Sequence, residues 1–377
     1  MANQDRYKEI DYLRAYAVLF IIILHILGAY QGVSPIFETF FKNTDFGMGV
    51  DLFFAISGFV IAKSLVCFWG PKKEEEKKHY LSQSLSFYKK RFLRLWPSAM
   101  VWLIISFCCA LVFHADGTWP GLVSMIKKLI SGAVYMYNFE EYSNPSVLGY
   151  FWSLSVEWQF YLVLPIILIF VNRDRFRFGI LFAAMVLSII VMPGGNGWWM
   201  LRFDGIVFGV LVYILFVRTG VELPDFKCLG SRIGRAGFTI IMLAGIAVLP
   251  TALSPSRFGI TVSSFLAAML VAVAYQNKGY ISTFGMRPLI AWLGSRSYSI
   301  YLCHFPCLLI ARSILARYIT MHDVLNPSHF ELLLSLTIII VSVVVFAEIT
   351  YRLIERPSLL ASQKIRLAPY EKPMSVS

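Results

Sequence analysis

The chain has 377 residues, of which 58% are hydrophobic and only 15% are charged. Its mean hydropathy of +0.66 and its repeated apolar runs of membrane-spanning length exclude a soluble globular protein. A formal net charge of +12 would suit a nucleic-acid partner, but most basic residues lie in short segments beside apolar runs, where membrane topology explains them. The composition therefore predicts a polytopic integral membrane protein of the all-α class that binds no nucleic acid.

Apolar runs bounded by charged and turn residues predict about ten membrane-spanning helices. With a cytoplasmic N-terminus, most Lys and Arg residues fall in cytoplasmic segments, as the positive-inside rule requires, so both termini should be cytoplasmic. We expect a transmembrane domain over residues 1–360 and a cytoplasmic tail over 361–377, with an interfacial or re-entrant helix at 122–137. The spans are expected near residues 12–30, 47–67, 96–114, 152–171, 178–192, 198–217, 237–252, 258–276, 295–317 and 331–354.

The first predicted span has the sequence RAYAVLFIIILHILGAY and carries two ionisable residues, Arg14 and His25. Their spacing corresponds to three helical turns plus roughly 20°, which places both side chains on one face, about 16 Å apart along the axis. A histidine inside hydrocarbon is costly unless it faces protein or a wet cavity. His25 is therefore a candidate for function, with a hydrogen bond to a neighbouring helix as the structural alternative.

A carboxylate lies at a similar predicted depth in the fourth span, FWSLSVEWQFYLVLP, at Glu157. A carboxylate bonded to one imidazole nitrogen fixes the tautomer of the ring and makes the other nitrogen a better base. We therefore expect Glu157 to orient His25 for acid–base chemistry. The alternative is a structural polar pair between two helices.

Three further groups of polar residues flank or enter the predicted spans. Arg91 and Arg94 lie three residues apart before Pro97, which we expect to open a helix. Guanidinium groups suit phosphate oxygens, although arginines beside a membrane are also ordinary topology anchors. On the outer side, Arg202 and Asp204 either line an acceptor site or anchor the sixth span.

His304 lies in the middle of the ninth span, two residues before Pro306. Since Pro306 cannot donate a backbone hydrogen bond, the carbonyl of Leu302 is freed and needs another donor. His304 either serves this local need or acts next to the catalytic group. In the last span, YRLIERP places Glu355 beside Arg356, where an ion pair is expected.

Taken in order, the motifs resemble those of the acyltransferase type three family of membrane-bound acyltransferases, over residues 6–360. The resemblance implies transfer of an acyl group from cytoplasmic acyl-coenzyme A to a hydroxyl of a glycan acceptor at the outer face of a bacterial inner membrane. Arg14, His25, Arg91 and Arg94 match functional motif positions of the family, whereas the role of Glu157 comes from geometry. The motifs are IDYLRA with Arg14 and His25, GVDLFFAISGFVIA, RFLRLWP, WSLSVEWQFYLVLP, SYSIYLCHFP and YRLIERP.

Some members of that family add a C-terminal extracytoplasmic hydrolase-like domain, and here we expect the membrane domain to work alone or with a separate partner. Acyl-coenzyme A, with acetyl as the expected acyl group, is then the donor substrate, and a glycan or lipid-linked saccharide is the acceptor. No permanently bound cofactor is expected, and the six cysteines show no spacing typical of a metal site.

The residues divide into three predicted roles. His25 acts as general base or as a transient acyl carrier, with Glu157 beside it. For the protein as a whole, the alternative functions are a proton-coupled transporter of an anionic metabolite that uses His25 and Glu157, and a glycan-binding scaffold without turnover. The predicted donor-binding residues are Arg14, Arg91 and Arg94, and the predicted substrate-binding residues are Arg202, Asp204 and His304.

Overall fold

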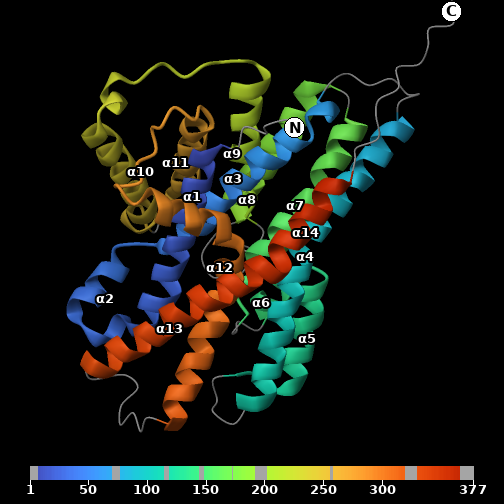
Figure 1. Ribbon diagram of the computed structural model, residues 1–377. Helices are drawn as coiled ribbons and strands as arrows, with labels where there is room; N and C mark the ends of the chain where they lie inside the picture. The colour runs from blue at the N-terminus through green and yellow to red at the C-terminus, as the bar shows by residue number, and fades with distance from the viewer. Residues whose placement is uncertain are drawn as a thin grey trace, which may run out of the picture.

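The computed structural model describes residues 7–69, 77–113, 119–143, 148–171, 173–191, 202–254, 258–318 and 329–365. Within these ranges the chain forms helices and no strand, which confirms the predicted all-α class (Figure 1). The helices are α1 (Lys8–Ile22), α2 (Pro35–Lys42), α3 (Gly49–Ser64), α4 (Lys77–Phe113), α5 (Leu122–Ala133), α6 (Tyr137–Ser143), α7 (Phe151–Phe170), α8 (Asp174–Val191), α9 (Asp204–Val212), α10 (Arg232–Ala252), α11 (Phe258–Tyr275), α12 (Arg287–Tyr318), α13 (His329–Thr350) and α14 (Arg356–Lys364).

Three helices continue into π-helical turns, in which the backbone bonds widen by one residue. α1 passes into η1 (Ile23–Leu27), α9 into η8 (Tyr213–Arg218), and α13 into η10 (Tyr351–Glu355), which joins it to α14. In Figure 1 the continuous rod of α13 and α14 crosses obliquely in front of α12 and α4. Shorter 3₁₀ turns are η2 (Gly28–Val33), η3 (Phe46–Met48), η4 (Val66–Phe68) and η9 (Lys227–Gly230).

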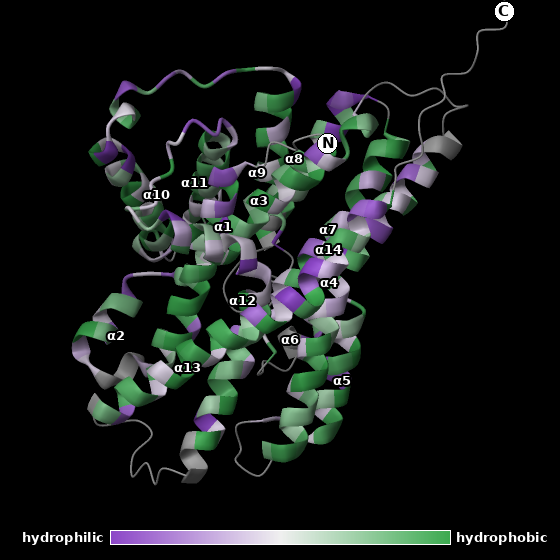
Figure 2. Ribbon diagram, viewed as in Figure 1, coloured by the Kyte–Doolittle hydropathy of each residue, from purple (hydrophilic) through white to green (hydrophobic). Residues whose placement is uncertain are grey.

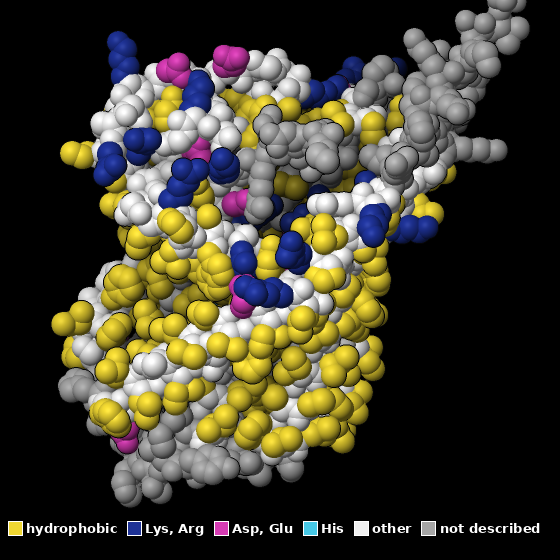
Figure 3. Space-filling model, in the orientation of Figure 1, with side chains coloured by type: hydrophobic (Ala, Val, Ile, Leu, Met, Phe, Trp, Pro, Cys, Tyr) yellow, Lys and Arg dark blue, Asp and Glu magenta, His cyan; other side chains and the backbone are white. Residues whose placement is uncertain are grey.

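The surface is that of a multi-pass membrane protein. Hydrophobic residues dominate the ribbon in Figure 2, and in Figure 3 a broad apolar surface lies below an end where Lys and Arg side chains gather. Three other predicted spans, 178–192, 198–217 and 295–317, are largely helical where the chain is described, in α8, α9 with η8, and α12, so the count of ten stays a prediction. The seven helical segments long and apolar enough to cross a membrane are Lys8–Tyr30, Phe46–Ser64, Tyr80–Phe113, Phe151–Phe170, Arg232–Ala252, Phe258–Tyr275 and Phe330–Lys364.

Close helix contacts at glycines build the centre of the molecule. A Cβ atom on Gly58 of α3 would lie 1.9 Å from the carbonyl oxygen of Ile206 in α9, and one on Gly209 of α9 would lie 2.1 Å from the carbonyl oxygen of Ala55. The same holds between α12 and α1, where a Cβ on Gly294 would lie 2.0 Å from a backbone oxygen of α1. Small residues allow backbones to approach closely in membranes, so these positions hold α1, α3, α9 and α12 together.

We expect Gly58→Ala to destabilise the protein by about 1 to 3 kcal/mol, because the added methyl group overlaps backbone atoms that cannot rotate away. Gly179→Ala in α8 is the matched control, since no atom lies within 4 Å of its added Cβ. Alanine generally favours a helix over glycine, so the control should be neutral or slightly stabilising. Thermal unfolding of both variants in detergent tests this. Equal unfolding midpoints would contradict the close contact between α3 and α9.

Two local predictions need correction. Pro97 does not open a helix, because α4 already begins at Lys77 and carries Pro97 in its interior. Membrane helices tolerate such a proline when neighbouring groups satisfy the freed backbone oxygen. The predicted helix at 122–137 is confirmed in part, as α5 ends at Ala133 and runs along α4, where Trp96 Nε1 donates to the carbonyl of Ala133 at 3.2 Å.

A buried arginine caps the C-terminal end of α7 through hydrogen bonds. Arg177 donates to the carbonyl oxygens of Leu168 at 2.9 Å and Trp69 at 3.0 Å, and its Nη1 also lies 3.0 Å from Asp174 Oδ1. Arg218 donates to the same Trp69 carbonyl at 3.1 Å. A hydrogen bond from Arg218 is the main cause that lowers the pKa of Asp174 below its usual value. The two arginines thus join the ends of α7 and η8 to the chain that follows α3.

Candidate active site

A cavity of about 760 Å³ lies among α1, α3, α4, α7, α12, η10 and α14. Tyr7, Lys63 and Gln363 line one end of it, and Phe53 with Ser153 line the other. The rise per residue along α3 from Phe53 to Lys63 places these two ends of the cavity roughly 15 Å apart. The two described ends of the chain therefore lie on one side of the molecule, and that this side is cytoplasmic remains a prediction. Four predicted site residues line the cavity: Arg14, Arg91, Arg94 and Glu157.

The three predicted arginines meet in the cavity although they come from two helices. Arg14 Nη1 lies 2.7 Å from Asp11 Oδ1, one turn earlier in α1. Arg91 Nη2 donates to the hydroxyl of Ser64 at 3.3 Å, and its guanidinium lies 5.1 Å from the ring centre of Tyr161. Within the described residues, Arg94 has no carboxylate at ion-pair distance. Its guanidinium is therefore available to an anionic ligand.

A fourth cation of this cavity, Lys63, was not predicted from the sequence. It lies in the last turn of α3, donates to the hydroxyl of Tyr7, and has its ammonium 4.0 Å from the centre of that ring. Lysines at the ends of membrane spans are common topology anchors, which is why its position in the sequence did not single it out. The carboxylates that line the cavity are Asp11, Glu157 and Glu355.

Glu157 has partners other than the predicted histidine. Its Oε1 accepts hydrogen bonds from the hydroxyl of Ser57 in α3 and of Tyr161 one turn later in α7. Among the contacts of the described residues there is none between Glu157 and His25. Glu157 and His25 were expected at a similar depth in the membrane, but their side chains point toward different neighbours. The direction of a side chain depends on the rotation of its helix about the helix axis, which cannot be derived from depth alone.

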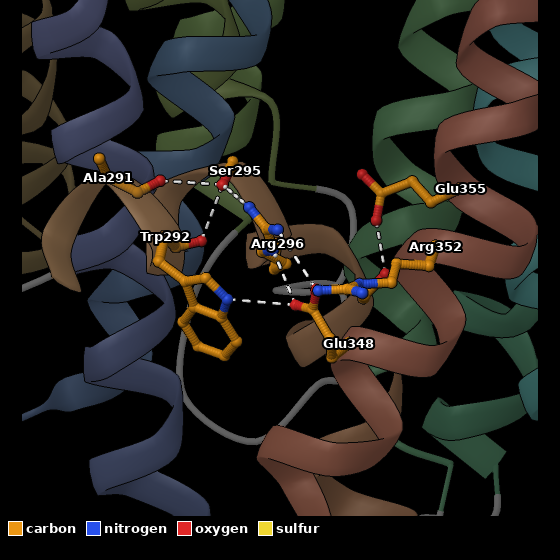
Figure 4. A network of polar contacts seen from close by, with 8 residues as sticks. Ala291, Trp292, Ser295, Arg296, Glu348, Arg352 and Glu355 are labelled. Carbon is orange, nitrogen blue, oxygen red and sulfur yellow. Dashed lines mark hydrogen bonds and ion pairs between the residues drawn. The ribbon is translucent and has the colours of Figure 1, made fainter. Parts of the chain in front are cut away.

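A polar network joins α12 to the rod of α13 and α14 beside the cavity (Figure 4). Glu348 of α13 accepts from Trp292 Nε1 at 3.1 Å, Arg296 Nε at 3.0 Å and Arg352 Nε at 2.5 Å. Glu355 does not take the expected place in an ion pair with its neighbour in the sequence, and accepts from the hydroxyl of Ser299 at 2.5 Å. These bonds join α12 to the rod of α13 and α14, and they fix the side of the cavity that Glu355 lines.

The two membrane histidines contact each other. His25 Nδ1 lies 3.0 Å from His304 Nε2, and His304 Nδ1 lies 2.7 Å from the carbonyl oxygen of Tyr301. His304 is fully buried, whereas His25 is partly exposed. His25 lies in the π-helical turn η1, and such turns often occur at functional sites. The freed carbonyl of Leu302 receives its hydrogen bond from the Tyr150 hydroxyl at 3.0 Å, so His304 is not needed there.

An aromatic wall separates this histidine pair from the cavity. Tyr301 and Phe53 both line the cavity, with ring centres 5.9 Å apart, and the ring of Tyr301 lies 5.6 Å from that of His304. The Tyr301 hydroxyl is held by the hydroxyl of Ser153 at 2.6 Å and by the carbonyl of Tyr150 at 2.9 Å. His25 itself is not among the residues that line the cavity.

The predicted acceptor residues Arg202 and Asp204 form a separate, enclosed cluster. Arg202 pairs with Asp51 of α3, which also accepts from Ser264 of α11 at 2.7 Å. Asp204 lies at the start of α9, with the hydroxyl of Thr261 at 3.5 Å from its Oδ2. Asp51 and Asp204 have no exposed surface, and Arg202 is only 7% exposed. In this conformation the two carboxylates offer no surface to an acceptor and Arg202 offers little.

A second, more open cavity of about 980 Å³ lies on the other face of the first turns of α1. Its cations are Lys8, Arg232, Arg235 and Arg287. The carboxylate of Glu9, which also lines it, accepts from the backbone nitrogens of Gly279 at 2.6 Å and Ile281 at 2.7 Å. This cavity is the competing place for a phosphate-bearing ligand, and it provides matched control variants for the first.

The chain is similar to known proteins, and this similarity identifies its family. A family model described as an acyltransferase domain matches residues 7–350, which include every residue of the histidine pair and all four cations of the first cavity. The chain belongs to this acyltransferase family. No solved structure matches it significantly.

Several curated bacterial proteins of the family are similar to the chain. The peptidoglycan O-acetyltransferase OatA of Listeria monocytogenes is 25% identical over 95% of this chain and 57% of its own length. The putative peptidoglycan O-acetyltransferase YrhL of Bacillus subtilis is 25% identical over 92% of this chain and 54% of its own. The O-acetyltransferase OatA of Staphylococcus aureus is 25% identical over 92% and 56%. The chain thus spans a little over half the length of these relatives.

Proposed function

We propose that this acyltransferase family member is a membrane-bound O-acyltransferase that moves an acetyl group from cytoplasmic acetyl-coenzyme A to a hydroxyl of a glycan at the outer face. The observation that carries the proposal is the cavity of about 760 Å³, which leads from a cation-rich end toward the histidine pair. Its size and its four cations suit a ligand with a charged head and a long arm.

The donor phosphates are placed at the cation-rich end. Arg14, Lys63, Arg91 and Arg94 approach the cavity from three different helices, so they can surround a group of phosphates. Planar guanidinium groups bind phosphate oxygens in pairs, and Lys63 adds a compact charge. The pantetheine arm then runs along α3 and places the thioester near the aromatic wall.

His25 is the general base of the reaction. Its free ring nitrogen takes the proton from the acceptor hydroxyl while that oxygen attacks the thioester carbonyl. The bond between carbonyl carbon and sulfur then breaks, and the departing thiolate takes the proton from the imidazolium. The products are the acyl ester and free coenzyme A, and the histidine returns to its neutral form.

Transfer requires the aromatic wall to open. Tyr301 lies between the cavity and His304, so the thioester reaches His25 when the side chain of Tyr301 leaves its bonds to Ser153 and to the carbonyl of Tyr150. Glu157 then belongs to the donor side of the wall and not to the base. We assign it to the cavity, where it lies among the cations that bind the donor.

The acceptor is a glycan, as the names of the relatives suggest for peptidoglycan. It approaches His25 from the outer side. We assign Arg202 and Asp204 to anchoring α9 against α3 and α11, because their cluster is enclosed.

Purified protein incubated with acetyl-coenzyme A labelled in the acetyl group, together with peptidoglycan fragments or a lipid-linked saccharide, should consume thioester and yield a labelled O-acetyl ester. The ester is identified by its loss in mild alkali. A protein that binds the donor but leaves the thioester intact with every acceptor would contradict the proposal. Movement of an intact labelled anion into sealed vesicles would instead favour the transporter alternative.

A further inference from the structure

In the histidine pair, the donor and the acceptor of each hydrogen bond can be derived, because the direction of one of these bonds is fixed by a carbonyl oxygen. His304 Nδ1 lies 2.7 Å from the carbonyl oxygen of Tyr301, and a carbonyl oxygen only accepts. Nδ1 of His304 therefore carries a proton. The protonation of its other nitrogen, Nε2, then depends only on whether the ring is neutral or charged.

The surroundings of His304 favour the neutral ring. The side chain has no exposed surface, and its neighbours are the rings of Tyr150 at 5.4 Å, Tyr301 at 5.6 Å and His25 at 5.0 Å. Within the described residues no carboxylate is bonded to it. An imidazolium without a counter-ion is costly in an apolar membrane interior, so Nε2 of His304 holds a lone pair.

The proton between the two rings must then belong to His25. Its Nδ1 lies 3.0 Å from the lone pair of His304 Nε2, so Nδ1 of His25 is the donor. A neutral imidazole has one N–H, and Nε2 of His25 is consequently unprotonated. This is the nitrogen that a general base needs.

We propose that His304 is a positioning residue that holds His25 in the tautomer with a proton on Nδ1 and a free lone pair on Nε2. The carbonyl of Tyr301 and the neutral ring of His304 together occupy the place that a carboxylate takes in other catalytic pairs. When His25 accepts the proton of the acceptor, His304 stays in place as the acceptor for Nδ1–H and stabilises the imidazolium. The role in turnover rests on the proposed function, whereas the tautomer does not.

The tautomer can be measured without any activity assay. The protein contains six histidines, and ¹⁵N spectra of protein labelled only at histidine distinguish protonated from unprotonated ring nitrogens. The signals of the pair are assigned from spectra of His25→Ala and His304→Leu. We expect His25 of the unmodified protein to show a protonated Nδ1 and an unprotonated Nε2. The reverse pattern would overturn the proposal.

Substitution of His304 tests whether this residue positions the His25 ring or only stabilises the fold. In His304→Leu we expect the fixed tautomer of His25 to be lost and kcat to fall about 10- to 100-fold, with the KM for the donor unchanged. Tyr150→Phe is the matched control: it removes a hydroxyl that donates to Leu302, in the same aromatic shell, without touching a ring nitrogen. It should leave the His25 spectrum unchanged even if it lowers the unfolding midpoint.

Two outcomes distinguish this inference from the function on which it rests. An unchanged His25 spectrum in folded His304→Leu, or the same spectral change in Tyr150→Phe, would refute the role of His304. If the expected tautomer is observed but His25→Ala retains full turnover, the assignment of His25 as base is wrong. The order of hydrogen bonds in the pair would still stand.

Discussion

Replacement of Arg91 and Arg94 together by alanine should weaken the binding of acetyl-coenzyme A by about 100-fold or more. Each charge-assisted hydrogen bond contributes roughly 1.5 to 3 kcal/mol, and a loss of 1.4 kcal/mol corresponds to a factor of ten. Both guanidinium groups line the cavity beside Arg14 and Lys63, so the double variant removes two of the four cations that surround the phosphates. Donor affinity is measured by calorimetry on purified protein in detergent.

The second cavity supplies the control for this experiment. Arg232→Ala with Arg235→Ala removes two arginines from the other large basic hollow, so it changes the net charge equally. Its donor affinity should be unchanged. Because Arg91 is buried and its loss can also destabilise α4, Arg94→Ala alone is measured as well, together with unfolding midpoints. A donor affinity that falls in the Arg232 and Arg235 variant, and not in the Arg91 and Arg94 variant, would move the donor to the second cavity.

Much of the fold could be predicted because a membrane-spanning segment can be recognised from its amino-acid composition. A run of apolar residues long enough to cross the bilayer has few alternatives to a helix. The helix that packs against Gly58 of α3 is given only by the structure, in which α9 approaches it closely. The helix ends were less predictable. Charged residues at the end of an apolar run can continue a helix as well as end it, and α4 extends back to Lys77 through a segment that also fits a loop.

Several members of the candidate site could be predicted from the sequence, but their contacts with one another could not. Arg14, Arg91 and Arg94 line one cavity, as their shared predicted side of the membrane suggested, whereas Glu157, which was expected at the depth of His25, lines the same cavity as the arginines. The partner of His25 is His304 and not Glu157, because the rotation of each helix about its own axis depends on all its neighbours. The π-helical turn at His25 adds to this, since it changes the direction of the side chain relative to a regular helix.

His25→Ala should lower turnover by about 10² to 10⁴-fold while donor affinity stays within about twofold, because a general base acts on the transition state and not on the bound donor. His25 is separated from the cation-rich end of the cavity by most of the length of α1 and by the wall of Tyr301, so its loss does not reach the phosphates. Turnover and donor affinity are measured on the same preparation.

Glu157→Gln is the comparison that separates the two assignments of this carboxylate. If Glu157 oriented His25, its amide variant would show a weaker form of the His25→Ala defect, because an amide cannot stabilise the imidazolium. Since Glu157 is bonded to Ser57 and Tyr161, and the His25 ring is held by His304, we expect the turnover of bound donor to fall far less than in His25→Ala. Near-normal turnover in folded His25→Ala would mean that the chemistry occurs on the donor side of the wall, with Glu157 as the remaining base.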